Sequence, residues 1–268
     1  MAGFDEFERR AWGGRAEAYG RSFGLLCAHT VPRLLDVAGV GVGVRVLDVG
    51  TGTGTVAAAA GARGAKVTAV DAEPSMVVAA GRAAPSAEVR LAVLPELPFA
   101  DDEFDAVVGN FVLNHVGRPA AALAELRRVT RPGGRIALTV WASPPASGQA
   151  LLGRAVQAAG VTRPADAPRL AAQDDFPRTE TGFAALLVDA GLAAPACETL
   201  AWTHHVDAEA WWSGPAAGIA TIGQIVTAQP PAVIASIRAH YDALCAPFRT
   251  PAGPLALPHT ALLAHATA

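Results

Sequence analysis

The chain has 268 residues and a formal net charge of −3, with 51% hydrophobic and 17% charged residues. This composition predicts a packed globular protein rather than a disordered one. No stretch approaches the roughly 20 apolar residues of a membrane-spanning helix, and no dense basic tract indicates nucleic-acid binding. The first residues are charged, so we expect no secretory signal. Three widely spaced cysteines, Cys27, Cys197 and Cys245, predict free thiols and a cytoplasmic location.

In chain order, residues 4–38 predict two helices, with Pro32 breaking or starting a turn. Short apolar runs then alternate with helical ones as far as residue 141, which predicts a parallel sheet with right-handed crossovers. Strands are expected at residues 44–49, 66–72, 87–93, 104–113, 135–141, 197–207 and 255–267, and helices at 55–63, 73–84, 119–130, 148–160 and 181–192.

The predicted fold is therefore α/β, a Rossmann-like, doubly wound and mostly parallel sheet of seven strands whose last strand is antiparallel. Residues 1–40 are expected to form a helical arm or cap. Residues 41–206 and 251–268 form the core, and residues 207–250 form a helical insertion that acts as a lid. In such sheets a ligand lies beyond the carboxyl ends of the strands.

Alternating glycines follow the first predicted strand in VLDVGTGTG, residues 46–54. Glycine permits positive φ and, having no Cβ, lets a ligand approach the backbone closely. Gly52-Thr-Gly54-Thr-Val-Ala57 also satisfies the dinucleotide pattern G-x-G-x-x-A, but this match is weak in a chain so rich in alanine. The stronger feature is the longer string, in which Asp48 precedes three glycines at every second position.

Together with three further segments, this string resembles the class I S-adenosylmethionine-dependent methyltransferases. VLDVGTGTG is similar to the family's first motif, and Asp71 ends the second strand in VTAVDAEPSM. LPFADDEFDAVV and LAELRRVTRPGGRIALTVW follow in the family's order. The four motifs cover residues 44–141, and the resemblance implies that S-adenosyl-L-methionine is the cofactor.

The resemblance also implies a set of cofactor-binding residues. Asp71 is expected to accept hydrogen bonds from the ribose hydroxyls, which suits a carboxylate. Val93 departs from the family, because relatives often carry there an aspartate that binds the adenine amine; the backbone of Leu94 can still contact the ring. The full set expected to hold the cofactor is Tyr19, Asp48, Gly50, Thr51, Gly52, Asp71, Ala72, Met76, Val93, Leu94 and Asn110.

These residues also have structural interpretations. Asp48 and Asp71 can simply cap the helices that follow them. Met76 can pack on a helix face, and Tyr19 can belong to the surface or the core. Asp101 and Asp102 are typical of a solvated turn, and we expect no metal site there or elsewhere.

Methyl transfer from a sulfonium requires alignment and, for some acceptors, a base. His115 follows the fourth strand and is the expected base, with packing against the next helix as the alternative. His204 and His205 are further catalytic candidates. Because neighbouring strand residues face opposite sides, at most one of the two points toward a pocket. Trp211, Trp212 and Tyr241 are expected to contact an apolar substrate, unless they only pack the inserted helices.

The chain lacks the Asn/Asp-Pro-Pro-aromatic motif typical of DNA methyltransferases, since residues 110–113 read NFVL. We therefore expect a small, apolar or aromatic acceptor, as in ubiquinone/menaquinone-type and natural-product methyltransferases, and neither a nucleic-acid nor a membrane partner. Lys66 is the only lysine, and this arginine-rich composition is typical of GC-rich bacteria with secondary metabolism. Two alternatives stay open: a cofactor-binding relative with non-methylating activity, and a nicotinamide-dependent oxidoreductase. A homodimer also stays open.

Overall fold

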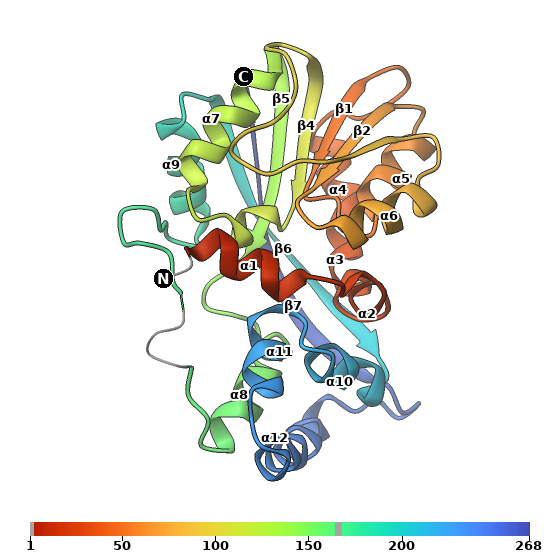
Figure 1. The fold of residues 1–268 in the computed structure, drawn as a ribbon, viewed down its shortest axis with the longest axis vertical. Helices are drawn as coiled ribbons and strands as arrows, with labels where there is room; N and C mark the ends of the chain where they lie inside the picture. Colours follow the sequence, from red (N-terminus) through yellow and green to blue (C-terminus); the bar gives the residue numbers. More distant parts are fainter. Residues whose placement is uncertain (1–2, 164–167) are drawn as a thin grey trace.

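The computed structural model describes residues 3–163 and 168–268. It contains one seven-stranded sheet with strand order β3-β2-β1-β4-β5-β7-β6, in which β7 runs antiparallel to both of its neighbours, β5 and β6 (Figure 1). This is the Rossmann-like sheet that the sequence predicts. The strands are Arg45–Val49 (β1), Lys66–Asp71 (β2), Glu88–Leu91 (β3), Phe104–Asn110 (β4), Thr130–Trp141 (β5), Ala193–Val206 (β6) and Leu255–Thr267 (β7).

Helices cover both faces of the sheet. One face packs against α4 and α5 through small residues such as Ala57 and Ala60, and the other packs against α7 and α9 through Leu123, Leu126 and Phe183. Each face is therefore dry, which explains the continuous apolar runs of the central strands. The helices on the sheet are Val31–Val37 (α4), Thr55–Ala62 (α5), Pro74–Ala83 (α6), Pro119–Val129 (α7) and Glu180–Asp189 (α9).

The N-terminal segment differs from the two helices that the sequence predicts, because it is broken into several short ones. Gly14, with a φ of +70°, lies between the first two helices. Ser22, with φ −127° and ψ −101°, separates the second helix from the third. Pro32 lies in the first turn of α4, where no intrahelical N–H bond is lost. The elements before α4 are Phe4–Trp12 (α1), Ala16–Arg21 (α2), Phe23–Cys27 (α3) and the 3₁₀ turn Ala28–Thr30 (η1).

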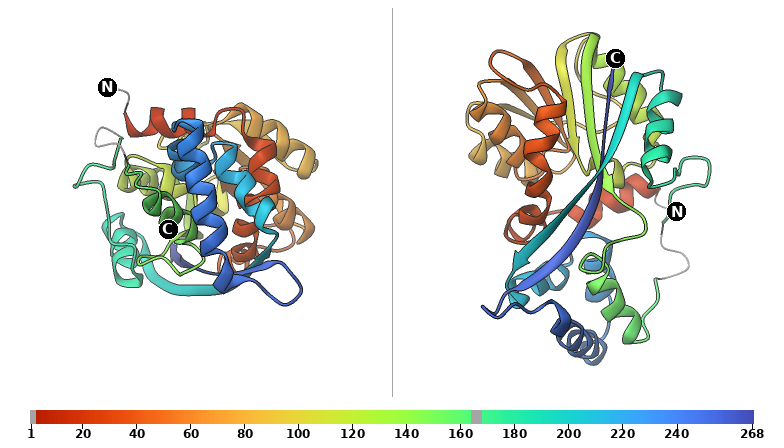
Figure 2. Two further views of the ribbon diagram at one scale, coloured as in Figure 1. Left: turned by 90° about the horizontal axis from the view of Figure 1, so that it is seen from below. Right: turned by 180° about the vertical axis from the view of Figure 1, so that it is seen from behind.

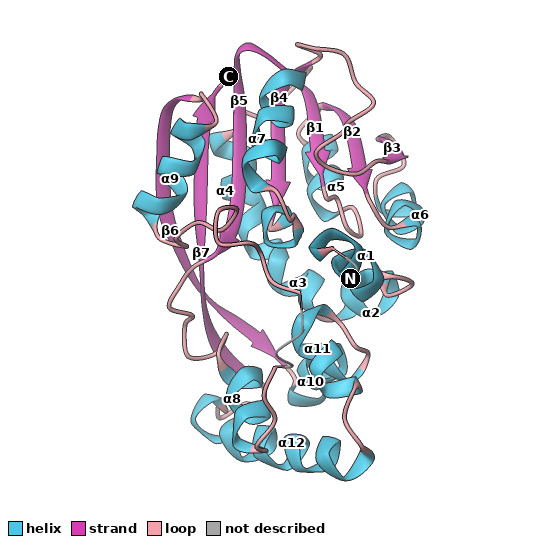
Figure 3. Ribbon diagram, turned by 60° about the vertical axis from the view of Figure 1, so that its left-hand side comes forward, coloured by secondary structure: helices cyan, strands magenta, loops and turns pink. Residues whose placement is uncertain are grey.

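A helical layer lies beyond the sheet and has its own core. The long strands β6 and β7 twist out of the sheet as a ribbon and reach this layer (Figures 2 and 3). Leu151, Trp212, Ile237 and Tyr241 are buried in it together with Leu257 of β7. The layer comprises Leu151–Ala158 (α8), Ala208–Ala216 (α10), Ala220–Thr227 (α11) and Pro231–Leu244 (α12), followed by the 3₁₀ turn Ala246–Phe248 (η3).

The helical layer thus extends beyond residues 207–250, because α8 packs on α12 although the sequence pattern assigns residues 148–160 to the core. The helix α1 lies between the sheet and this layer in Figure 1 and contacts α11. Among the described residues, no helix combines the length and the apolar character that crossing a membrane requires. These elements leave a cavity between the carboxyl ends of the strands and the helical layer.

Candidate active site

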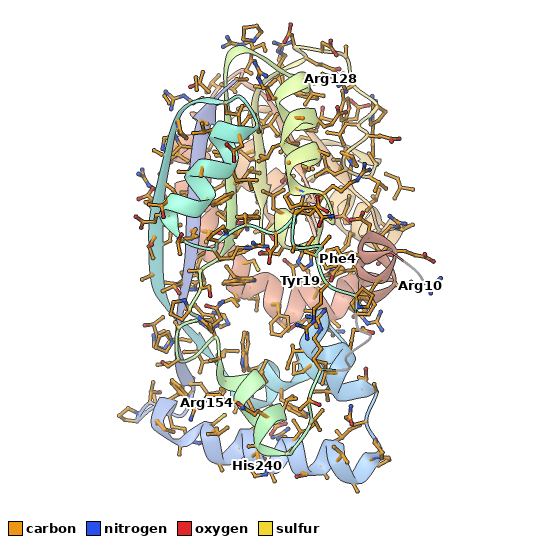
Figure 4. The ribbon with its side chains drawn as sticks, turned by 90° about the vertical axis from the view of Figure 1, so that its left-hand side faces the viewer. Phe4, Arg10, Tyr19, Arg128, Arg154 and His240 are labelled. Atoms are coloured by element: carbon orange, nitrogen blue, oxygen red, sulfur yellow. The ribbon has the colours of Figure 1, made fainter. Side chains whose placement is uncertain are left out.

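The cavity has a volume of about 480 Å³, within the range of small-molecule sites. Its lining comes from the ends of β1, β2, β4 and β5, from α1 to α3, and from the helical layer. Figure 4 shows Tyr19 at this level, between the sheet and the lower helices, whereas Arg128 lies at the opposite end of the sheet. The edge that the sequence predicts for a ligand is therefore the edge that is hollow.

The bend after β1 can be built only with glycine. Gly50 and Gly54 have φ of +69° and +87°, and a Cβ on Gly50 would lie 2.5 Å from Val112. A Cβ on Gly54 would lie 2.8 Å from the backbone of Ala80. Gly52, with φ +56°, lines the cavity together with Gly50. Gly50 and Gly52 therefore present bare backbone to the cavity.

Asp71 ends β2 and lines the same cavity. Its Oδ2 accepts a 2.8 Å hydrogen bond from Gly52 N, and its Oδ1 accepts a 3.0 Å bond from Glu73 N. Burial raises the pKa of this carboxyl above its ordinary value, while the two backbone donors oppose the rise. Each carboxylate oxygen keeps a lone pair for a further donor, so Asp71 can bind two ligand hydroxyls.

Asp48 has a different place from the one expected. It is fully buried, and neither Asp48 nor Thr51 belongs to the lining of the cavity described here. The Thr51 hydroxyl donates a 2.6 Å bond to Asp48 Oδ2, so the pair supports the bend from behind. Burial raises the pKa of the Asp48 carboxyl to about 7, and its Oδ1 has no partner among the described residues. Asp48 lies within β1, just before the bend, and its carboxylate is buried beside Thr51 and not in the cavity lining.

An apolar wall lies beside Asp71. Met76 is 3% exposed on α6, a helix whose first turn is capped by Glu73, which accepts from Met76 N at 3.0 Å. Val93 and Leu94 complete the wall from the segment after β3. This arrangement of the Asp71 carboxylate beside an apolar wall fits a nucleoside. Of the residues at this end, Glu73 and Ala92 were not predicted, and Ala72, Met76, Val93 and Leu94 were.

Tyr19 and Asn110 also line the cavity. The side chain of Asn110 is fixed, because its Oδ1 lies 2.7 Å from the hydroxyls of Thr30 and Thr139 and its Nδ2 donates to Cys27 O at 3.0 Å. Tyr19 packs edge-on against Trp12 with 5.4 Å between ring centroids, and burial raises the pKa of its hydroxyl. Both side chains keep one orientation toward a ligand.

His115 lines the cavity and has a partner that the sequence does not reveal. Its Nδ1 lies 2.8 Å from Oε2 of Glu8 on α1, and Glu8 is only 8% exposed. The imidazole edge also packs on Trp12, with 5.1 Å between centroids. Since a carboxylate can only accept, the contact assigns the proton of neutral His115 to Nδ1 and leaves Nε2 as the basic nitrogen. Only a residue 107 positions away supplies this orientation.

The other end of the cavity is aromatic. Phe111 and Trp141 stack with centroids 4.1 Å apart, and Trp211 and His259 meet edge to face at 5.8 Å. Phe111 has a φ of +62°, a strained conformation for a bulky residue, and its N–H donates to Thr139 at 2.9 Å. Such strain is typical of functional sites. Neither Phe111, Trp141 nor His259 was among the predicted site residues.

Several candidates on this side need correction. His204 is buried and His205 is exposed, as strand alternation requires. Neither histidine lines the cavity, whereas His259 of the neighbouring strand does. Trp211 lines the cavity, whereas Trp212 packs on Tyr241 and the Tyr241 hydroxyl donates to Ala208 O. Residue type and helix assignment do not decide which aromatic faces inward. Among residues 3–163 and 168–268, no cluster of three or more potential ligands suits a metal ion.

The comparisons with known proteins agree with this architecture. Residues 47–138 match the family model described as "Methyltransferase domain". The demethylmenaquinone methyltransferase of Beutenbergia cavernae is 39% identical over 82 residues, 31% of this chain and 34% of that protein. The matched stretch therefore spans about a third of this relative.

Solved structures cover more of the chain at lower identity. The YcgJ protein of Bacillus subtilis has a TM-score of 0.57 at 19% identity, over 89% of this chain and 97% of that one. The [4+2]-cyclase SpnF has a TM-score of 0.53 at 19% identity, over 90% of this chain and 80% of that one. At such identity these likenesses establish the fold alone.

The sheet order, the glycine bend and the domain match agree with one another: residues 47–138 are similar to a methyltransferase domain, and they lie on a Rossmann-like fold. The cavity fits S-adenosyl-L-methionine, the cofactor that the sequence predicts, on its own geometry. Gly50 and Gly52 line it with bare backbone, and Asp71 has acceptor capacity for two hydroxyls beside an apolar wall.

Proposed function

We propose that the protein transfers a methyl group from S-adenosyl-L-methionine to a small, apolar or aromatic acceptor, by O- or C-methylation. The observation that carries the proposal is one continuous cavity, with Asp71 and the glycine bend at one end and the aromatic residues Phe111, Trp141 and Trp211 at the other. The cofactor supplies a methyl group already activated by the sulfonium charge. The protein then has to align the acceptor and exclude water.

The cofactor-end residues act by orientation. Asp71 holds the ribose hydroxyls, and Ala72, Met76 and Leu94 contact the adenine. Gly50, Gly52, Tyr19 and Asn110 would hold the methionine part. The fixed amide of Asn110 supports this role, since it cannot reorient to follow a misplaced ligand.

His115 is the proposed base for an acceptor hydroxyl. Its Nε2 would take the hydroxyl proton as the methyl group leaves the sulfonium sulfur for the oxygen, and the Glu8 carboxylate on Nδ1 would stabilise the resulting imidazolium. Glu8 contacts His115 and not the reacting atoms, so it is a positioning residue. A carbon acceptor needs this base less, because its nucleophile is the carbon itself.

A second candidate function is non-methylating chemistry on a bound cofactor. It is favoured by one observation, the presence of the [4+2]-cyclase SpnF among structures with this fold. The proposed role in bacterial secondary metabolism rests on composition, and the cytoplasmic location on the free cysteines. The two activities differ in whether S-adenosylhomocysteine is formed during turnover.

Calorimetric titration with S-adenosylhomocysteine tests the cofactor assignment, with NAD as the comparison ligand. We expect micromolar binding of S-adenosylhomocysteine, on the order of −8 kcal/mol, and none of NAD. Asp71→Asn should weaken binding at least about tenfold, because it removes charge-assisted hydrogen bonds. Asp102→Asn is the matched control: Asp102 is exposed with a φ of +60°, which asparagine tolerates. Tight NAD binding without S-adenosylhomocysteine binding would reject the proposal.

A further inference from the structure

Buried polar atoms without partners gather at the aromatic end of the cavity. In the part of the chain that the structure describes, eight buried side-chain nitrogen or oxygen atoms have no hydrogen-bond partner. Five of them belong to His259 or to residues beside it, and such atoms are normally satisfied in folded proteins. The five residues are Gln149, Trp202, His204, Trp211 and His259.

Strand register brings this group together. Trp202 of β6 pairs with His259 of β7, and its indole stacks on the imidazole with 5.9 Å between centroids. His204, two residues further along β6, lies on the same face and meets His259 edge to face at 6.1 Å. Gln149 joins them because its backbone N–H donates to Pro258 O at 3.2 Å. Three of the five, Gln149, Trp211 and His259, line the cavity.

The tautomer of His259 follows from its one hydrogen bond. Its Nδ1 lies 2.9 Å from Leu257 O, and because a carbonyl can only accept, Nδ1 carries the proton. Nε2 is therefore a lone-pair acceptor, and it has no partner among the described residues. Burial lowers the pKa of His259 to about 4, so the ring is neutral at physiological pH. Next to it, the Nε1–H of Trp211 is an unpaired donor.

The charge around this group limits what it can bind. Within the described lining, the charged side chains are on α1 or at the end of β2, and this end carries aromatic, aliphatic and amide groups. An ionised substrate group placed here would lose its hydration with no counter-charge. A ring fits against Phe111 and Trp141, and a neutral hydroxyl is the group that can accept from Trp211 and donate to His259 at once.

We propose that this end of the cavity binds the aromatic ring of an uncharged, hydroxyl-bearing acceptor, and that His259 selects it by accepting the hydrogen of a hydroxyl other than the one that His115 deprotonates. The inference rests on the proposed methyltransferase function and adds to it a substrate class, a phenol-like aromatic, and a specificity residue. His259 contacts the substrate through Nε2, and Trp211 donates to the same oxygen.

The test measures binding of three probes to the full chain saturated with S-adenosylhomocysteine, by tryptophan fluorescence and calorimetry. The probes are 2-naphthol, its methyl ether 2-methoxynaphthalene, which has lost the donor, and 2-naphthoate, which is charged. We expect 2-naphthol to bind about tenfold more tightly than the ether, and naphthoate to bind most weakly. Equal binding of 2-naphthol and the ether, preferred binding of naphthoate, or no binding of any probe would overturn the proposal.

Variants then assign the preference to one residue. His259→Phe keeps a ring but removes the acceptor, so the preference for 2-naphthol should fall to near one. His259→Gln places an amide acceptor close to Nε2 and should retain most of it. His265→Phe is the matched control on the same strand, outside the cavity lining. If His259→Phe still prefers 2-naphthol to the ether, His259 is not the specificity residue. If His259→Phe fails to fold, loss of the preference in His259→Gln would also contradict the proposed role of His259.

The two proposals fail in different ways. If S-adenosylhomocysteine does not bind but the free protein still prefers 2-naphthol to its ether, the cofactor assignment is wrong and the phenol site stands. If S-adenosylhomocysteine binds and no preference appears, the phenol site alone is rejected.

Discussion

Oε2 of Glu8 on α1 lies 2.8 Å from Nδ1 of His115, the last residue of the 3₁₀ turn Val112–His115 (η2). The Glu8 side chain is 10% exposed and that of His115 is 34% exposed, so the contact is sheltered on the carboxylate side and open on the imidazole side. Asp5, one turn earlier on α1, accepts from Gly117 N at 2.6 Å. The helix α1 is thus held against the loop that carries the proposed base.

From this contact we predict the kinetics of two variants. His115→Ala should lower turnover of a hydroxyl acceptor by roughly 10²-fold or more, the usual contribution of a general base. Glu8→Gln should lower it by about tenfold, because an amide neither fixes the tautomer nor stabilises the imidazolium. The measurement is S-adenosylhomocysteine release, together with calorimetric binding of S-adenosylhomocysteine, which should stay unchanged in both.

Glu6→Gln is the control for the Glu8→Gln variant. It makes the same substitution on the same helix, at a residue whose ion pair is with the exposed Arg10. Loss of turnover in Glu8→Gln matched by an equal loss of cofactor binding would mean that Glu8 docks α1 and does not position His115. The double variant should be no slower than His115→Ala, since both changes remove one interaction.

Gly50→Ala should destabilise the fold and abolish cofactor binding. The left-handed backbone costs a non-glycine residue about 1–2 kcal/mol, and moving Val112 away from the new Cβ adds about 1–3 kcal/mol. Gly133→Ala separates the two effects, because Gly133 has a φ of +74° with nothing within 4 Å of a Cβ. In urea denaturation, Gly133→Ala should lose only the free energy of unfolding that the left-handed backbone costs. Equal losses in the two variants would show that Val112 moves away freely.

From the raised pKa of Asp48 we predict how the free energy of unfolding depends on pH. With a pKa of about 7 in the folded protein against an ordinary 3.8, this carboxyl holds a proton that the unfolded chain releases between about pH 4 and pH 7. Its contribution to the free energy of unfolding therefore falls as the pH rises through that window, by roughly 4 kcal/mol at most.

Asp48→Asn removes this dependence while keeping an acceptor for the Thr51 hydroxyl. The stability of the variant relative to the parent protein should therefore improve from pH 4 to pH 8, as measured by urea denaturation at each pH. Other titrating groups are common to both proteins and cancel in the difference. A constant difference would mean that Asp48 is ionised throughout this range.

Val93 offers a gain-of-function test. It lines the cavity and is 38% exposed, so an aspartate there can reach a ligand while staying hydrated. Val93→Asp should tighten S-adenosylhomocysteine binding about tenfold or more through a charge-assisted hydrogen bond to the adenine amine. Leu91→Asp, at an exposed residue outside the lining, should change nothing. Weaker binding in Val93→Asp would place the adenine elsewhere.

Local pattern was sufficient for the sheet. The apolar run around Leu47 and Val49 is buried on both faces, and the glycines after it take the positive φ that their spacing predicts. Asp71 likewise had to lie at the ligand edge, because it ends a strand parallel to β1. For these residues the strand period and the chain direction fix where the backbone goes.

Contacts between side chains far apart in the sequence could not be predicted in this way. The parallel sheet, the bend after β1 and the carboxylate beside it could be predicted, since each depends on residues close together in the chain. The contact by which Glu8 orients His115, and the burial of Asp48 beside Thr51, could not. Nor could the result that His259 and Trp211, rather than His204, Trp212 or Tyr241, line the cavity. Those outcomes depend on the docking of α1 and on the register and twist of the β6–β7 ribbon, which no local pattern encodes.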